Sequence, residues 1–327
     1  ISMKFKIGIS GDLINSDGLP CFGEGSLEKI YNRKDLQMEW MNPSIAELSQ
    51  DLTAKYDAIL LNLPKANEES VKRNDCRLKI ISRFGVGFDS VDIKAMKDKG
   101  IIVANTPNAV RRPVAVAALT MVFALSGKLF LKDDLVRSDK WNERTNHMGF
   151  GLTKKVLGII GCGSIGSELM KLSAPFFGKI VGYDPFVSKE EMFKKGIEKL
   201  DFHDLATQSD FVVVLCNLNK DTEGLVDIDF LKKMKKNAFF INMSRGPVVN
   251  EKDLIFVLEK NLIAGAGLDV FNEEPINKNN KLLNLKNTIL TPHALCWTDE
   301  CFSEIANEAI SNILNYVDGK PIQNRVN

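Results

Sequence analysis

The feature that most constrains the fold is a regular alternation of short β-branched runs with helical patterns along most of the 327 residues. This alternation is typical of α/β folds, in which helices connect parallel strands. Before residue 105, strand-like runs lie at 4–10, 36–41, 58–63, 78–84 and 101–105. Five such runs are enough for one complete small sheet.

A second series of strand-like runs follows a long helical stretch, which is predicted from Pro113 to Ser138. The first part of this stretch, VAVAALTMVFAL, is more apolar than one buried helix face requires, so we expect it to lie at a subunit interface. Six further runs then predict a doubly wound nucleotide-binding domain. They lie at 156–161, 179–184, 211–216, 238–243, 264–270 and 288–291. Apolar residues at helical spacing predict a last helix over 298–317.

Composition and charge exclude several classes of protein. The chain has 43 Lys and Arg against 42 Asp and Glu, which lacks the basic excess of a dedicated nucleic-acid binder. We find no run of about 18 to 20 uninterrupted apolar residues and no apolar signal segment. The six cysteines match no zinc spacing and are expected to be reduced thiols. We therefore expect a cytoplasmic protein with no metal, nucleic-acid or membrane partner.

The glycine motif G-C-G-S-I-G at 161–166 stands between a strand-like run and a helical pattern. Glycine spacing alone is weak evidence for a nucleotide site, because glycines also make ordinary strand-to-helix turns. The next run ends in Asp184, whose carboxylate can accept hydrogen bonds from adenosine ribose hydroxyls while a pyrophosphate lies on the helix N-terminus. The alternative is that Asp184 only caps its strand before Pro185. A negative charge there disfavours a 2′-phosphate, so we predict NAD rather than NADP.

The chain has three histidines, so a proton-transferring imidazole must be one of them. His147 lies in a polar loop and His203 in the acidic segment DFHD, which favours surface positions for both. His293 follows the last strand-like run, at the sheet edge where doubly wound folds bind ligands. Arg245 and Glu274 follow other strands of the same sheet and can converge with His293. For either residue alone, a structural role is the plainer interpretation.

Six motifs in order give the chain a resemblance to a known family. They are GVGFDSVD at 85–92, GIIVANTP at 100–107, VLGIIGCGSIG at 156–166, INMSRGPVVN at 241–250, AGLDVFNEEP at 266–275 and TPH at 291–293. With them the chain resembles the D-isomer-specific 2-hydroxyacid dehydrogenases along essentially its whole length. The resemblance implies hydride transfer between NAD and a D-2-hydroxy acid or its 2-keto acid.

The resemblance also implies roles for individual residues. Arg245 binds the substrate carboxylate and polarises the keto oxygen, His293 is the acid/base, and Glu274 hydrogen-bonds His293 and favours its protonated form. Backbone amides of Gly85, Val86 and Gly87 offer hydrogen bonds to the substrate carboxylate, with a plain strand-end turn as the alternative. The residues implied to bind the cofactor are Gly161, Gly163, Ser164, Ile165, Gly166, Asp184, Thr222 and Asp269.

The family fold implies two doubly wound parallel-sheet domains. Residues 1–104 and 297–327 form a flavodoxin-like substrate domain that is split in sequence. Residues 105–296 form the inserted Rossmann domain for NAD, including the dimerisation helix, so we expect a homodimer.

Three segments depart from the family pattern. In one of them, Leu215 and Asn217 replace the usual His and Pro before the cofactor adenine. Pro113 to Val116 stand where Ser-Val-Ala-Glu is common, and the preceding Arg111 and Arg112 are open between a substrate contact and an interface or surface position. Trp297 follows His293 closely, so we expect it to line the substrate pocket, with a packing role as the alternative.

A second class of function stays open, that of an NAD(H)-sensing regulator like the C-terminal-binding corepressors. These resemble the chain throughout and carry a tryptophan shortly after the same histidine, although here the tryptophan stands one residue farther on. Turnover of a keto acid separates the two classes.

Overall fold

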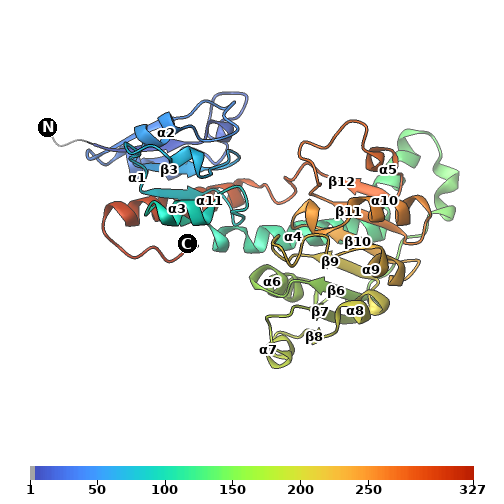
Figure 1. Ribbon diagram of the computed structural model, residues 1–327. Coiled ribbons are helices and arrows are strands. Elements are labelled where there is room, and N and C mark those ends of the chain that lie inside the picture. Colours follow the sequence, from blue (N-terminus) through green and yellow to red (C-terminus); the bar gives the residue numbers. More distant parts are fainter. Residues whose placement is uncertain (1–3) are drawn as a thin grey trace. The chain divides into compact units, whose positions relative to one another are not determined.

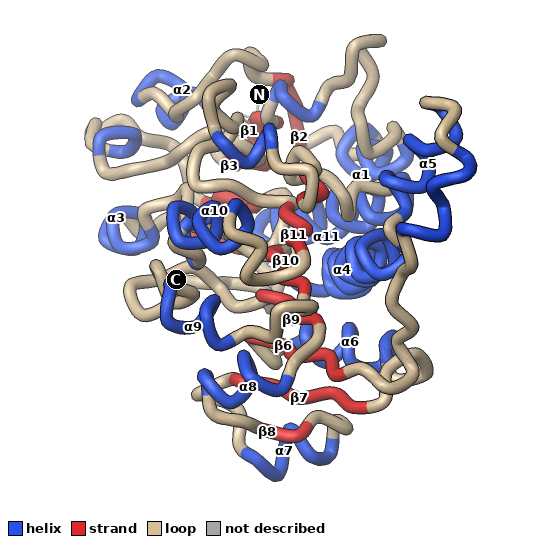
Figure 2. Tube along the Cα trace, turned by 90° about the vertical axis from the view of Figure 1, so that its right-hand side faces the viewer, coloured by secondary structure: helices blue, strands red, loops and turns tan. Residues whose placement is uncertain are grey.

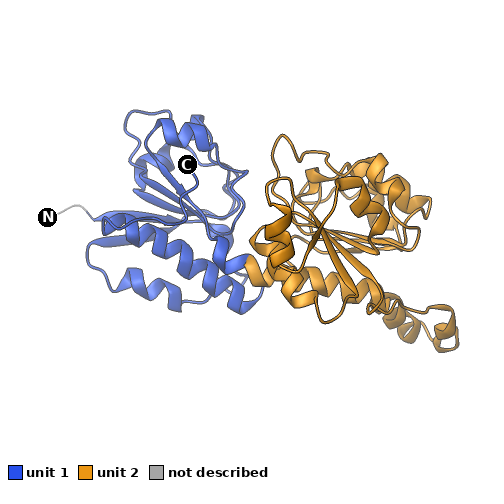
Figure 3. Cartoon of the chain, turned by 90° about the horizontal axis from the view of Figure 1, so that it is seen from below, with its two compact units in different colours: residues 1–110, 297–327 blue, residues 111–296 orange. Residues whose placement is uncertain are grey.

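The computed structural model describes residues 4–327, which form two compact units (Figure 3). Unit 1 contains the chain up to Val110 together with Trp297–Asn327, and unit 2 is Arg111–Cys296. The sequence placed the first boundary after residue 104. The structure moves it because Asn105 N donates to Asn324 O (3.1 Å) and Ala109 N donates to the Glu308 carboxylate (2.9 Å), so both stay with unit 1.

Unit 1, whose residues up to Val110 are drawn mainly in blue to teal in Figure 1, has within the described residues a parallel five-stranded sheet of order β2-β1-β3-β4-β5. Its strands are β1 (Phe5–Ile9), β2 (Leu36–Trp40), β3 (Ala58–Leu61), β4 (Ile80–Arg83) and β5 (Ile102–Ala104). Its α-helices are α1 (Glu28–Tyr31), α2 (Gln50–Lys55), α3 (Ile93–Asp98) and α11 (Asp299–Val317), and its 3₁₀ turns are η1 (Gly11–Leu13), η2 (Gly25–Leu27) and η3 (Glu69–Val71). The strand order is the flavodoxin-like one that the family resemblance implied.

Both faces of this sheet are covered. On one face, Ile59, Ile81 and Val103 from neighbouring strands form a core with Met96 of α3. On the other face lies α11, where Ser82 Oγ of β4 donates to Ala309 O (2.8 Å). The C-terminal helix, distant in sequence, thus completes unit 1.

Unit 2 has a parallel seven-stranded sheet of order β12-β11-β10-β9-β6-β7-β8 in the described chain. The strands are β6 (Val156–Ile160), β7 (Lys179–Tyr183), β8 (Glu198–Lys199), β9 (Phe211–Val214), β10 (Phe239–Asn242), β11 (Gly265–Leu268) and β12 (Thr288–Leu290). The helices are α4 (Pro107–Gly127, which begins in unit 1), α5 (Leu129–Arg137), α6 (Ser164–Ser173), α7 (Lys189–Lys194), α8 (Phe202–Gln208), α9 (Ile228–Lys233) and α10 (Glu251–Glu259), with 3₁₀ turns η4 (Trp141–Asn146), η5 (Gly246–Val248) and η6 (Lys281–Asn284). The strand order reverses between β6 and β9, which is where doubly wound folds bind dinucleotides.

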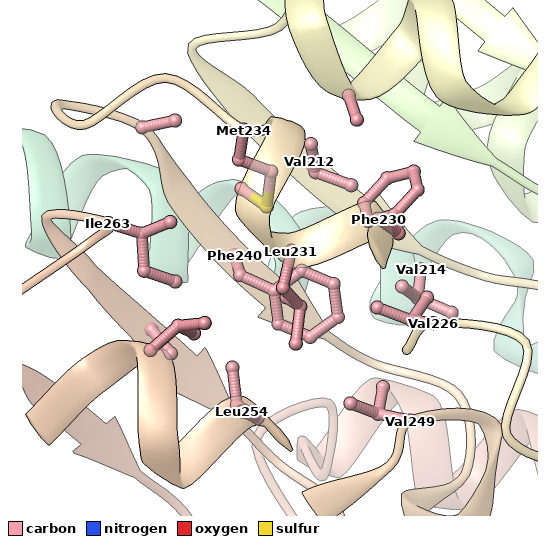
Figure 4. Packing of buried hydrophobic residues seen from close by; sticks show 14 of the residues in the cluster. Val212, Val214, Val226, Phe230, Leu231, Met234, Phe240, Val249, Leu254 and Ile263 are labelled. Carbon is pink, nitrogen blue, oxygen red and sulfur yellow. The ribbon is translucent and has the colours of Figure 1, made fainter. Parts of the chain in front are cut away.

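Successive residues of the strands in unit 2 alternate between two cores. Val212 and Val214 of β9 point to a core with α8, α9 and α10 (Figure 4), whereas Phe211 and Val213 point to a core with α4 and α6. Figure 2 shows these helices on opposite sides of the strands. This burial on both faces explains the continuous apolar runs of the sequence.

The prediction of one continuous helical stretch from Pro113 to Ser138 is wrong, because the structure has two helices there, α4 and α5. α4 begins earlier, at Pro107, where the Glu308 carboxylate caps Ala109 N, and Pro113 lies inside it. It ends at Gly127 because Ser126 O accepts from Phe150 N of the returning chain (2.8 Å) and Lys128 takes a left-handed conformation.

By length and composition alone, α4 is the one helix of residues 4–327 that qualifies as a membrane span. The core helix of a folded domain passes the same test, and 61% of the most apolar window of α4 is buried. Met121, Val122 and Leu125 belong to the core of unit 2, so packing on the sheet accounts for much of its apolar character.

Candidate active site

Four of the predicted residues lie beyond the carboxyl ends of three adjacent strands of unit 2. Arg245 follows β10, Asp269 and Glu274 follow β11, and His293 follows β12. Because the carboxyl ends of parallel strands meet at one edge of a sheet, the fold gathers these four side chains there.

The structure places His293 and Glu274 in direct contact. His293 Nδ1 lies 2.7 Å from Glu274 Oε2, and the other carboxylate oxygen, Oε1, accepts from Phe271 N (3.0 Å). The His293 and Glu274 side chains are 41% and 36% exposed, so a ligand can reach them. Since Nδ1 faces Glu274, Nε2 is the ring nitrogen that can exchange a proton with a ligand.

The surroundings of Glu274 keep it ionised. Burial raises its pKa, but the hydrogen bond and charge of His293, the Phe271 amide and the charge of Arg245 together lower it more, so the pKa of Glu274 lies below its ordinary value. Glu274 is therefore a carboxylate at neutral pH.

Gly246 allows the loop of Arg245 to pack closely on the segment that leads to Glu274. A Cβ atom at Gly246 would lie 2.0 Å from the carbonyl carbon and oxygen of Phe271, so a larger residue would push the two segments apart. Arg245 O accepts from Asn242 Nδ2 (2.9 Å), which fixes the backbone of the loop. The half-buried Arg245 side chain donates to Ser244 O (2.8 Å).

Asp269 holds the loop that carries His293, a role that the sequence analysis missed. Its Oδ1 atom accepts from the Thr291 hydroxyl (2.6 Å), Ala294 N (3.1 Å) and Leu295 N (3.2 Å), on both sides of the histidine. Burial raises the pKa of Asp269, and these hydrogen bonds oppose the rise. His293 itself has a φ of 52°, a left-handed conformation that needs such support. The predicted contact between Asp269 and the cofactor stays a prediction.

The glycine motif forms the turn between β6 and α6. Gly161 has a φ of 94°, and a Cβ there would lie 2.5 Å from Cys216 N, so the turn requires glycine. At Gly163 a Cβ would meet nothing within 4 Å, which leaves space for a pyrophosphate at the N-terminus of α6. Gly163, Ser164, Ile165 and Gly166 form this terminus, so the predicted residues fit a dinucleotide.

Asp184 is tied to the glycine motif. Its Oδ2 atom accepts from Cys162 N (2.9 Å) and its Oδ1 atom accepts from Phe186 N (2.9 Å). The second contact is the strand cap that the alternative interpretation expects. Each oxygen keeps a further lone pair, so the carboxylate can still accept from a ribose hydroxyl.

Two other residues make contacts within unit 2 that the sequence did not predict. The Thr222 hydroxyl donates to Asn217 O (2.6 Å) and accepts from Asn219 N (2.8 Å), which closes the loop after β9. Its cofactor contact stays a prediction. Arg112 Nη1 lies 2.9 Å from Glu168 Oε1 of α6, so this arginine forms an ion pair within its own chain.

Unit 1 contains the other predicted substrate residues. Gly85, Val86 and Gly87 follow β4, and Trp297 directly precedes Thr298, the N-cap of α11. The Trp297 ring packs on Phe302 in a tilted arrangement, with 4.9 Å between ring centroids, and Phe302 makes an edge contact with Phe84 (5.1 Å). Trp297 therefore has a packing role, while 52% of its surface stays exposed.

Comparison with known proteins gives a consistent result. A model of the family described as D-isomer specific 2-hydroxyacid dehydrogenase, NAD binding domain, matches residues 119–294. The glyoxylate reductase of Thermococcus litoralis is 33% identical over 317 residues, which are 94% of each protein.

The D-3-phosphoglycerate dehydrogenase of Archaeoglobus fulgidus is 35% identical over 273 residues, which are 84% of this chain. These residues are 52% of that protein, so the chain spans about half the length of the phosphoglycerate dehydrogenase that it matches. Among solved structures, D-lactate dehydrogenase from Aquifex aeolicus, complexed with NAD and lactic acid, has a TM-score of 0.84 at 26% identity and covers 96% of each chain.

Proposed function

The chain belongs to the D-isomer-specific 2-hydroxyacid dehydrogenase family, and from this premise we propose that it interconverts a D-2-hydroxy acid and its 2-keto acid with NAD. Residues 119–294 match the NAD-binding domain of the family. The observation that carries the proposal is the His293–Glu274 contact of 2.7 Å at the sheet edge that also bears Arg245.

In this proposal Arg245, Glu274 and His293 act by ordinary acid/base and electrostatic chemistry. NADH, when bound, supplies the hydride that reduces C2 of the keto acid. The guanidinium of Arg245 binds the substrate carboxylate and polarises the keto oxygen. His293 Nε2 donates a proton to that oxygen, and Glu274 stabilises the charged imidazole that makes the donation possible. In the oxidation direction, neutral His293 takes the proton back.

The test of the proposed function is NADH oxidation, followed by absorbance, with glyoxylate, pyruvate, hydroxypyruvate and phosphohydroxypyruvate. We expect turnover of at least one of these keto acids. NADH binding without turnover of any of these keto acids would contradict the proposed enzymatic activity and favour the NAD(H)-sensing regulator.

Asp184 sets the expected preference for NADH over NADPH. Replacing Asp184 with alanine should weaken NADH binding, because the ribose hydroxyls lose an acceptor, and should improve NADPH binding, because the repulsion of the 2′-phosphate is removed. Titration of both cofactors by fluorescence measures the two changes. Asp201→Ala, at the N-cap of α8, serves as the control. Equal binding of NADPH and NADH by the unchanged protein would contradict this assignment.

We also propose that the chain forms a homodimer through α4 and the segment that follows it. Several large apolar side chains there are exposed, namely Val116, Phe123, Leu129, Phe130, Val136 and Trp141. Such a surface favours association, and two-fold symmetry is the commonest closed arrangement.

Light scattering at low micromolar concentration should therefore report twice the chain mass of 36.4 kDa. Phe130→Glu should shift the mass towards one chain, because it places a charge in the proposed interface. A fully active monomer would contradict the proposed dimer.

A further inference from the structure

The turn at residues 85–87 of unit 1 has every backbone carbonyl held by a hydrogen bond. Three different groups provide the donors. Thr106 N donates to Gly85 O (3.0 Å), Asn105 Nδ2 donates to Val86 O (2.9 Å), and Arg83 Nε donates to Gly87 O (3.0 Å). The turn is therefore fixed in one orientation.

The backbone N–H groups of the same turn are arranged differently. Gly85 N donates to Thr106 Oγ1 (3.0 Å), whereas within residues 4–327 the amides of Val86 and Gly87 donate to no acceptor. Both residues are partly exposed, so these two amides can reach a ligand. Adjacent amides of this kind form a site for an anion such as a carboxylate.

The fixed carbonyls determine where these two amides point. In a trans peptide the N–H group points opposite to the carbonyl of the preceding residue. The hydrogen bond to Gly85 O therefore orients Val86 N–H, and the bond from Asn105 to Val86 O orients Gly87 N–H. Asn105 is 7% exposed and is itself held, since its carbonyl accepts from Asn312 Nδ2 (3.0 Å).

Arg83 fixes the far end of the turn to the neighbouring strand. Its buried guanidinium donates through Nε to Gly87 O and through Nη1 to Leu61 O (2.6 Å) and Asn62 O, at the end of β3. One planar group thus joins the loops after β3 and β4. A lysine keeps the charge but lacks the fork of donors that reaches both loops.

We propose that Asn105 and Arg83 are positioning residues for the turn that binds the substrate carboxylate. The Asn105 side chain orients the Gly87 amide through Val86 O, and the Arg83 side chain anchors the end of the same turn through Gly87 O. The inference rests on the proposed function, because it takes a 2-keto acid as the ligand. It adds two residues that contribute through the turn, without touching the reacting atoms.

The test compares Arg83→Lys and Asn105→Ala with Arg77→Lys as a matched control. Arg77 lies just before β4, at the opposite edge of the same sheet, where it pairs with Asp57 (2.8 Å). For Arg83→Lys and Asn105→Ala, we expect KM for the keto acid and the dissociation constant of oxamate to rise by about tenfold or more, the size expected for weakened hydrogen bonds to a charged group. We expect kcat and NADH binding to change much less, and the control to resemble the unchanged protein.

Each outcome of the experiment has a separate meaning. A protein that turns over keto acids, but whose two variants match the control in KM and in oxamate binding, contradicts the positioning role alone. A drop in kcat with KM and oxamate binding unchanged contradicts it as well. Absence of turnover in the unchanged protein contradicts the proposed function. Melting temperature and NADH binding identify a variant that fails to fold, and the other variant then decides.

Discussion

Replacing His293 with alanine is expected to lower turnover by about 10²- to 10⁴-fold, the range for loss of a general acid or base. The reason is that Nε2 of this ring is the proposed proton donor, while Glu274 holds Nδ1 at 2.7 Å. Binding of NADH should stay unchanged, because the cofactor is expected at the glycine motif and Asp184. Steady-state turnover and fluorescence titration of NADH measure the two quantities on the same sample.

His203→Ala is the matched control, because His203 is exposed on α8. We expect this variant to retain full turnover. Near-normal activity of the His293 variant would show that the proton donor lies elsewhere, and loss of NADH binding would show that the substitution disturbs more than acid/base chemistry.

The alternation of apolar runs was enough to predict both sheets, because parallel strands buried on two faces need continuous apolar sequence. Two features could not be predicted from that pattern. β8 has only Glu198 and Lys199, too few residues for a periodicity, and the break at Lys128 depends on a hydrogen bond from Phe150, which is distant in sequence. Local patterns cannot show contacts of this kind.

For the candidate site, too, some features could be predicted from the sequence and others could not. Each of Arg245, Glu274 and His293 follows a predicted strand, so their convergence at one edge of the sheet could be predicted from sequence. The roles of Arg245 and Glu274 came from the family resemblance. The anchoring of the His293 loop by Asp269 could not, since it depends on how the backbone after β12 turns back towards β11. Asn105 stands within a recognised motif, but only the structure shows its contact with Val86 O.

Replacing Glu274 with glutamine is expected to move the pH dependence of catalysis to lower pH. Glutamine keeps the size of the side chain and an oxygen acceptor for Nδ1, so the substitution chiefly removes a negative charge. The pKa of Glu274 is lowered by its surroundings, so this carboxylate stays charged throughout the neutral range. The stabilisation that the Glu274 charge gives to the pair with His293 is fully present above the ordinary pKa range of glutamate. It is lost only as the pH falls through the lowered pKa of Glu274.

Reduction of a keto acid requires protonated His293, so kcat/KM for reduction falls on the alkaline side as that proton is lost. Without the charge of Glu274 the protonated form of the pair is stabilised less, so the alkaline limb of kcat/KM for reduction should move to lower pH. Oxidation requires neutral His293, so its acid limb should move in the same direction. Pre-steady-state or steady-state pH profiles in both directions measure these shifts.

Glu273→Gln provides the control. Glu273 is the neighbour of Glu274, and this substitution removes the same charge from the same loop. Its pH limbs should coincide with those of the unchanged protein, because the carboxylate that lies 2.7 Å from His293 Nδ1 belongs to Glu274. If both variants shift the limbs equally, the effect is one of overall charge. If neither variant shifts them, Glu274 does not stabilise the protonated ring, and the 2.7 Å contact serves to orient His293 instead.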